Sequence, residues 1–190
     1  AAVRMREDVE SVARVTLQND RAAAIQALRG ADSLLARGLQ QEPHWPALLV
    51  ERARLRLSMS RLLDDQLAMT VMDSGVAFAS EALKHAADDP SALIVRGQLL
   101  LTTAYHEAAA AGDTARYRRA AEDLRRATVL APYRADAWMT MHQLQTHLGQ
   151  FEMARASARR AFENDAFMYD SERAYFALFA AAVGTKDIDD

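Results

Sequence analysis

The sequence contains no cysteine, and its 190 residues include only seven glycines and four prolines. The lack of cysteine excludes disulfides, thiol catalysis and thiolate metal sites. No run of about 20 uninterrupted apolar residues is present, which argues against a transmembrane helix, and no signal-peptide pattern is visible. Alternating runs of valine, isoleucine and threonine are also missing, so the sequence offers no obvious strands.

Charge of either sign is not in marked excess. The formal net charge is −3, which gives no electrostatic reason to expect nucleic acid or an anionic membrane as a partner. Apolar residues make up 51% of the chain, more than a disordered protein would carry. The chain begins with Ala1-Ala2 and no initiating methionine, so we expect a piece of a longer protein. We favour a cytoplasmic location, with the extracytoplasmic part of a membrane-anchored protein as the alternative.

Apolar residues recur at three- and four-residue spacings along the chain, which predicts helices. Capping and helix-breaking residues separate them, at Pro43, Pro46, Asp64-Asp65, Asp88-Asp89-Pro90, Gly112-Asp113, Ala131-Pro132 and Gly149. The predicted helices cover residues 3–18, 21–40, 48–63, 66–87, 91–111, 114–130, 135–148, 151–164 and 171–183, and a polar tail follows at 184–190.

Small residues recur in step along these helices. The 34-residue segment 135–168 contains Trp138, Gly149, Ala154 and Ala161 at fixed places. Small side chains let two helices approach closely, and a tryptophan fills space between layers. The same frame continues towards the N-terminus through Ala127, Gly97, Ala82, Ala53 and Gly38.

This frame predicts a single repeat domain over 1–183, built from helical hairpins at about 3–41, 46–87, 90–131 and 135–166 and a capping helix at 171–183. The two middle units exceed 34 residues by 10 and 11. Three helical turns take about 10.8 residues, so the longer hairpins keep their apolar faces in register.

With these residues the chain resembles the tetratricopeptide repeat family, specifically over 127–168 and more weakly over 38–126. The resemblance implies an all-α solenoid of helical hairpins and a non-catalytic protein-interaction module. Four blocks are also similar to repeat regions appended to bacterial serine/threonine kinases and related signalling proteins: residues 32–35, 92–97, 121–125 and 160–166. No kinase motif is present.

Two residues depart from the family pattern. His142 stands where the family prefers a small residue, and Gln145 where it prefers an aromatic one. These changes predict either looser packing or polar groups that need partners. The carboxylate clamp of lysine and asparagine on the inner helices has no counterpart, so an acidic chaperone tail is not the expected partner.

The resemblance also implies that the first helix of each hairpin lines a concave face. The positions predicted to be exposed on this face and to bind a partner are Val50, Arg54, Leu57, Ser58, Ile94, Val95, Gln98, Leu101, Met139, Thr140, Gln143 and His147. Such a mixed apolar and polar surface suits an extended or helical peptide. The alternative is that Val50, Leu57 and Leu101 are simply buried by the long hairpins.

No pattern predicts catalysis, a metal or a cofactor. His142 and His147 are five residues apart, which is not the spacing of two ligands on one helix face, and His106 is directly followed by Glu107. No nucleophile elbow or phosphate loop occurs. One local basic cluster, formed by Arg116, Arg118, Arg119, Arg125, Arg126 and Arg134, has acidic residues interleaved and is typical of a solvated helix face.

The sequence therefore favours a module that binds a protein, a peptide or a second copy of itself. The alternative function is a regulatory domain that senses a small ligand and acts on an attached signalling catalytic domain.

Overall fold

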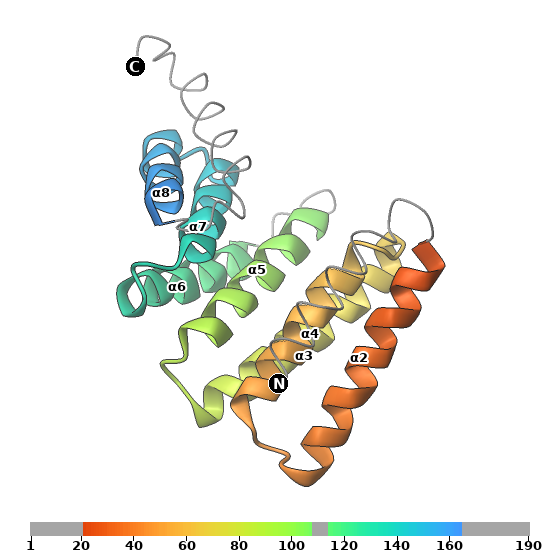
Figure 1. The fold of residues 1–190 in the computed structure, drawn as a ribbon. Coiled ribbons are helices and arrows are strands. Elements are labelled where there is room, and N and C mark those ends of the chain that lie inside the picture. Colours follow the sequence, from red (N-terminus) through yellow and green to blue (C-terminus); the bar gives the residue numbers. More distant parts are fainter. Residues whose placement is uncertain (1–20, 108–113, 165–190) are drawn as a thin grey trace.

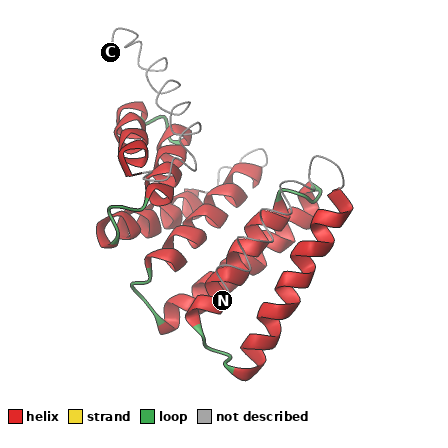
Figure 2. Ribbon diagram, in the orientation of Figure 1, coloured by secondary structure: helices red, strands yellow, loops and turns green. Residues whose placement is uncertain are grey.

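A computed structural model describes residues 21–107 and 114–164. Within these ranges the chain forms seven α-helices and no strand (Figures 1 and 2). The helices are α2 (Arg21–Gln41), α3 (Pro46–Ser60), α4 (Asp65–His85), α5 (Pro90–Glu107), α6 (Thr114–Leu130), α7 (Ala135–His147) and α8 (Phe151–Asn164). The predicted helices at 3–18 and 171–183 and the tail at 184–190 lie outside the described residues.

Consecutive helices pack as hairpins that stack side by side. The most extensive contacts join α3 to α4, α5 to α6 and α7 to α8, and each hairpin meets the next through α4 with α5 and α6 with α7. The first helices also contact each other, α3 with α5 and α5 with α7, so they form one layer of the stack (Figure 1). The predicted all-α helical repeat is confirmed.

The recurring small residues lie where the helices come closest. Ala53, Ala82, Ala127 and Ala161 are all fully or almost fully buried. A Cβ placed on Gly97 of α5 would lie 2.8 Å from Cγ of Leu124 on α6, which is inside van der Waals contact. Hydrogen is therefore the only side chain that fits at Gly97 without moving its neighbour.

Gly75 of α4, which is equivalent to Ala154 in the repeat frame, makes a further close approach. A Cβ there would lie 2.9 Å from Cβ of Arg56 on α3 and 2.9 Å from Cδ1 of Leu99 on α5. The helix α4 is thus held between the first helices of two successive hairpins. The equivalent residues of the other hairpins, Ala31, Ala120 and Ala154, are also small and buried, so a second small position recurs along the stack.

Some helix ends differ from the predicted ones. The helix α3 ends at Ser60 and not at Leu63, because the backbone turns there with a hydrogen bond from Leu62 N to Met59 O. Leu62 nevertheless stays buried, which explains its place in the apolar pattern. The side chain of Asp64 then caps α4 by accepting from the backbone N–H of Leu67, as its type predicts.

The helices of the two middle hairpins are longer than those of the last hairpin. Helices α4, α5 and α6 have 21, 18 and 17 residues, whereas α7 and α8 have 13 and 14. Within the last hairpin, α7 and α8 are joined by a turn at Gly149, whose φ of 70° is the left-handed conformation that glycine adopts most readily. The predicted end of α5 at Gly112-Asp113 and the full extent of the domain include residues that the structure does not describe, and both stay predictions.

A pair of identical substitutions tests the close approach at Gly97. Gly30→Ala meets nothing within 4 Å, so it should raise the free energy of unfolding by about 0.5–1 kcal/mol through helix propensity alone. Gly97→Ala gains the same propensity but overpacks against Leu124, which costs about 1–3 kcal/mol. We expect the free energy of unfolding of Gly97→Ala, measured by urea denaturation, to be at least about 1 kcal/mol lower than that of Gly30→Ala. Equal stabilisation by both substitutions would contradict the tight contact.

Candidate partner-binding groove

The layer formed by α3, α5 and α7 carries a small open hollow. Its volume is about 80 Å³, and it is lined by Leu57, Arg61, Gln98, Thr102, Asp136, Met139, Thr140 and Gln143. These residues come from all three first helices and from the turn that follows α3. We call this surface the inner groove. It crosses three successive hairpins and collects side chains that are distant in the sequence.

Hydrogen bonds fix the polar part of the inner groove. Gln98 Nε2 donates to Thr140 Oγ1 at 3.1 Å, which ties α5 to α7. The Thr140 hydroxyl donates to the carbonyl of Asp136, and the Thr102 hydroxyl donates to the carbonyl of Gln98. Gln98 and Gln143 are only half-buried. An amide carries both donors and acceptors, so these two side chains can pair with the backbone of a bound peptide.

All six apolar positions predicted for the concave face are buried, and so is Thr140. Seven residues are only 1–9% exposed: Val50, Leu57, Ile94, Val95, Leu101, Met139 and Thr140. The prediction that these side chains are exposed is therefore wrong, because each packs against neighbouring helices. Ile94, for example, lies in a cluster with Leu93, Ala127 and Ala137. For Val50, Leu57 and Leu101 the alternative interpretation, burial by the long hairpins, is the one that holds.

Apart from Thr140, the polar members of the predicted set remain accessible. Arg54, Ser58, Gln98 and Gln143 are half-buried, and His147 is exposed. His147 lies against Tyr105, with 5.1 Å between the ring centroids. Five predicted positions line the inner groove: Leu57, Gln98, Met139, Thr140 and Gln143. Their role in binding a partner stays a prediction.

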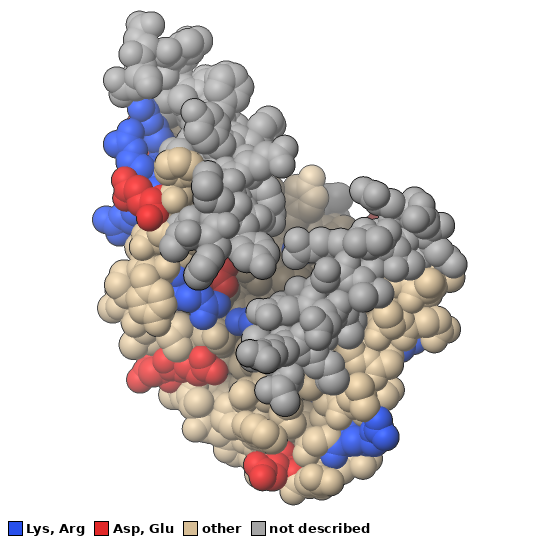
Figure 3. All heavy atoms as spheres, viewed as in Figure 1, with Lys and Arg blue, Asp and Glu red and all other residues tan. Residues whose placement is uncertain are grey.

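Charges around the inner groove are paired. Asp136 accepts two hydrogen bonds from Arg134, at 2.9 and 2.6 Å, and Arg54 lies 3.3 Å from Glu51. Figure 3 shows one face of the molecule, on which the described charged side chains of both signs are spread without gathering into a patch of one sign. The groove thus offers shape and amide groups more than net charge.

No protein-family model matches the sequence, and no curated protein does. Solved structures do match it. A crystal structure of MamA is 14% identical and covers 85% of this chain and 80% of its own, with a TM-score of 0.62. A thermophilic TPR protein of Thermus thermophilus is 16% identical, with a TM-score of 0.65, and its match covers 93% of this chain and 82% of the Thermus protein. A second MamA structure is 14% identical, with a TM-score of 0.56, and its match covers 96% of this chain and 83% of the MamA chain.

The chain has the tetratricopeptide repeat fold. At 14–16% identity the likeness concerns the fold alone, and it confirms the fold that the small residues predicted. None of the described helices is long and apolar enough to cross a membrane.

The two departures from the tetratricopeptide pattern have polar partners. His142 Nδ1 lies 3.1 Å from the carbonyl oxygen of Ala154, and because a carbonyl only accepts, Nδ1 carries the proton. Gln145 Oε1 accepts from Ser157 Oγ at 2.8 Å. Both bonds join α7 to α8. Burial lowers the pKa of His142, and the hydrogen bond to Ala154 opposes this shift in part.

The basic cluster predicted around α6 is divided among ion pairs. Three of its six members pair with carboxylates: Arg116 with Asp73 at 3.2 Å, Arg126 with Asp88, and Arg134 with Asp136 at 2.6 Å. Arginines held in this way are typical of the solvated helix face that the interleaved acidic residues indicated.

One constellation was missed by the sequence reasoning. His44, in the connection between α2 and α3, comes together with Glu81 and His85 of α4. Hydrogen bonds from Lys84 and then from His85 lower the pKa of Glu81. The spacing of Glu81 and His85, four residues apart, is a signal that places both on one helix face. No pattern in the sequence indicates that His44 joins them.

The buried imidazole predicts a pH-dependent stability. The pKa of His142 in the folded chain lies below its ordinary value of 6.5, so the unfolded chain binds the proton more readily. The stability that neutral His142 gives to the folded chain is therefore lost as the pH falls below about 6.5. We expect the difference in unfolding free energy between the unsubstituted chain and His142→Gln to shrink between about pH 7 and pH 5. Urea titrations at each pH measure it. A difference that stays constant would show that His142 keeps its ordinary pKa.

Proposed function

We propose that this chain is a non-catalytic interaction module that binds a peptide segment of a partner protein in the inner groove. The observation that carries the proposal is the meeting of Gln98, Thr102, Met139 and Gln143 in one hollow across two successive first helices. Stacked hairpins hold such a surface preformed, which lowers the entropy cost of binding.

The chemistry of the groove favours a peptide. The half-buried amides of Gln98 and Gln143 match the alternating donors and acceptors of an extended backbone. Met139 and Leu57 contribute the apolar part of the lining, and methionine adapts its shape to different side chains. The single carboxylate among the described lining residues, Asp136, is held by Arg134, which suits a structural role better than acid–base work.

The size of the hollow bears on the alternative function. Sites for metabolite-sized ligands enclose about 300–1,000 Å³, whereas this hollow measures about 80 Å³. A shallow contact surface for a chain that runs across the helices agrees with that volume better than a sensory pocket does. Attachment to a larger signalling protein stays a separate prediction.

Selection from a random-peptide display library on the full chain tests the proposal. We expect enriched peptides to bind the chain in fluorescence polarisation and to lose at least about tenfold in affinity, or about 1.4 kcal/mol, with Gln143→Arg. The arginine would fill the groove from a half-buried position without entering the core.

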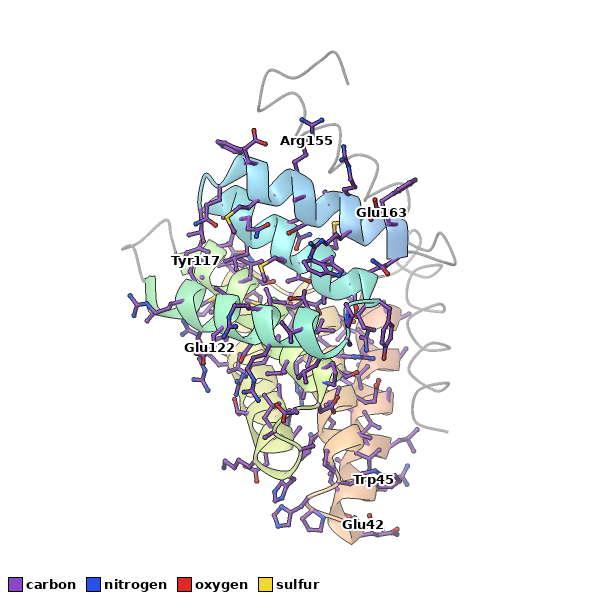
Figure 4. The ribbon with its side chains drawn as sticks, turned by 90° about the vertical axis from the view of Figure 1, so that its left-hand side faces the viewer. Glu42, Trp45, Tyr117, Glu122, Arg155 and Glu163 are labelled. Atoms are coloured by element: carbon purple, nitrogen blue, oxygen red, sulfur yellow. The ribbon has the colours of Figure 1, made fainter. Side chains whose placement is uncertain are left out.

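The matched control places the same residue on another surface. Glu122 of α6 is exposed and points away from the helix stack (Figure 4), so Glu122→Arg should leave the affinity unchanged. If no peptide is enriched, or if both variants bind equally well, the inner groove is not the binding surface.

A further inference from the structure

Three side chains with metal-binding atoms meet at one end of the molecule. His85 Nε2 lies 3.3 Å from Glu81 Oε1, and His44 Nδ1 lies 4.0 Å from the same oxygen. All three donor atoms are within 4.8 Å of one another. The two imidazole rings are in contact, with 4.5 Å between their centroids. Figure 4 shows Glu42 and Trp45, which flank His44 in the sequence, at this end of the chain's fold.

The distances fit a tetrahedral zinc ion after small movements. Zinc binds nitrogen and oxygen at about 2.0–2.1 Å, which places two tetrahedral ligands about 3.4 Å apart. The 3.3 Å between His85 and Glu81 already meets this value. The side chain of His44 is 68% exposed and its Nδ1 lies 4.0 Å from Glu81 Oε1, so its ring has room to turn towards the other two ligands.

The three ligands come from two segments of the fold, which also favours a metal site. Glu81 and His85 are one helical turn apart in α4, so the helix itself holds two donors on one face. His44 approaches from a different segment, the connection that precedes α3. Sites in which a helical pair is completed by a third residue from elsewhere hold an ion more firmly than two neighbours on a surface.

Without a metal the same atoms form ordinary surface ion pairs. Lys84 Nζ donates to Glu81 Oε2 at 2.6 Å, which leaves Oε1 facing both histidines. His85 donates its Nε2–H to that oxygen at 3.3 Å, because a carboxylate only accepts. A metal ion would take the place of this hydrogen once the neutral ring carries its proton on the other nitrogen. The charge of Lys84 opposes a cation, but its side chain is 68% exposed and can turn towards solvent.

We propose that His44, Glu81 and His85 form a binding site for a zinc ion or a similar late first-row divalent ion. Two imidazoles and one carboxylate are ligands that these metals take, with a fourth position left to water or to a partner's side chain. The bound ion would clamp the connection between α2 and α3 to the last turn of α4. This proposal is independent of peptide binding in the inner groove.

Titration of the metal-free, tag-free full chain with Zn²⁺ in a calorimeter and with Co²⁺ in a visible spectrometer tests the site. We expect one ion per chain, Co²⁺ bands of tetrahedral intensity and a melting temperature that rises with Zn²⁺. His44→Ala and Glu81→Gln should each weaken binding by more than about tenfold, since even the loss of a supporting residue costs 10–100-fold. Lys84→Ala should tighten binding, because it removes a competing cation.

The matched control is His106→Ala. His106 Nδ1 lies 3.9 Å from Asp65 Oδ1, and among the described residues no third ligand joins this histidine–carboxylate pair, so its loss should leave the affinity unchanged. Absence of binding up to about 1 mM Zn²⁺ would overturn the proposal. So would binding that survives His44→Ala, since the site would then be a two-residue surface chelate. Circular dichroism checks that each variant is folded.

Discussion

The close approach of neighbouring helices at small residues is the constraint on which the other features depend. Gly97 and Gly75 leave no room for a Cβ, and Ala53 and Ala82 are completely buried. Backbones this close fix how one helix lies on the next, so the first helices α3, α5 and α7 meet along one layer. The inner groove exists because these three helices are held in register.

In two successive hairpins, an arginine of the first helix contacts the residue at the equivalent position of the second helix, but the kind of contact differs. Arg52 and Arg96 are 44 residues apart on first helices, and Phe78 and Asp123 are 45 apart on second helices. The guanidinium of Arg52 lies 4.2 Å from the ring centroid of Phe78, whereas Arg96 donates two bonds to Asp123 at 2.7 and 2.6 Å. Stacking on an aromatic face and a bidentate ion pair both suit arginine, so the helix spacing survives the exchange.

The fold was predictable from the sequence because its signals are local. Helical periodicity and the recurrence of Ala82 and Ala127 depend only on spacing along the chain. The exposure of individual side chains was less predictable. The repeat frame places Ile94 and Val95 on a first helix, but whether they are buried depends on how neighbouring helices cover them. The meeting of His44 with Glu81 and His85 required the path of a loop, which no periodic pattern contains.

The two proposed sites lie at opposite ends of one helix. His44 stands two residues before Pro46, where α3 begins, whereas Leu57 and Arg61 of the inner groove stand at its other end. Fifteen residues of helix span about 22 Å, so neither site touches the other. A metal ion at the first end would fix the start of α3 relative to α4 and leave the groove residues in place. Any effect of the metal on peptide affinity would therefore have to act through the rigidity of α3 and not through shared contacts.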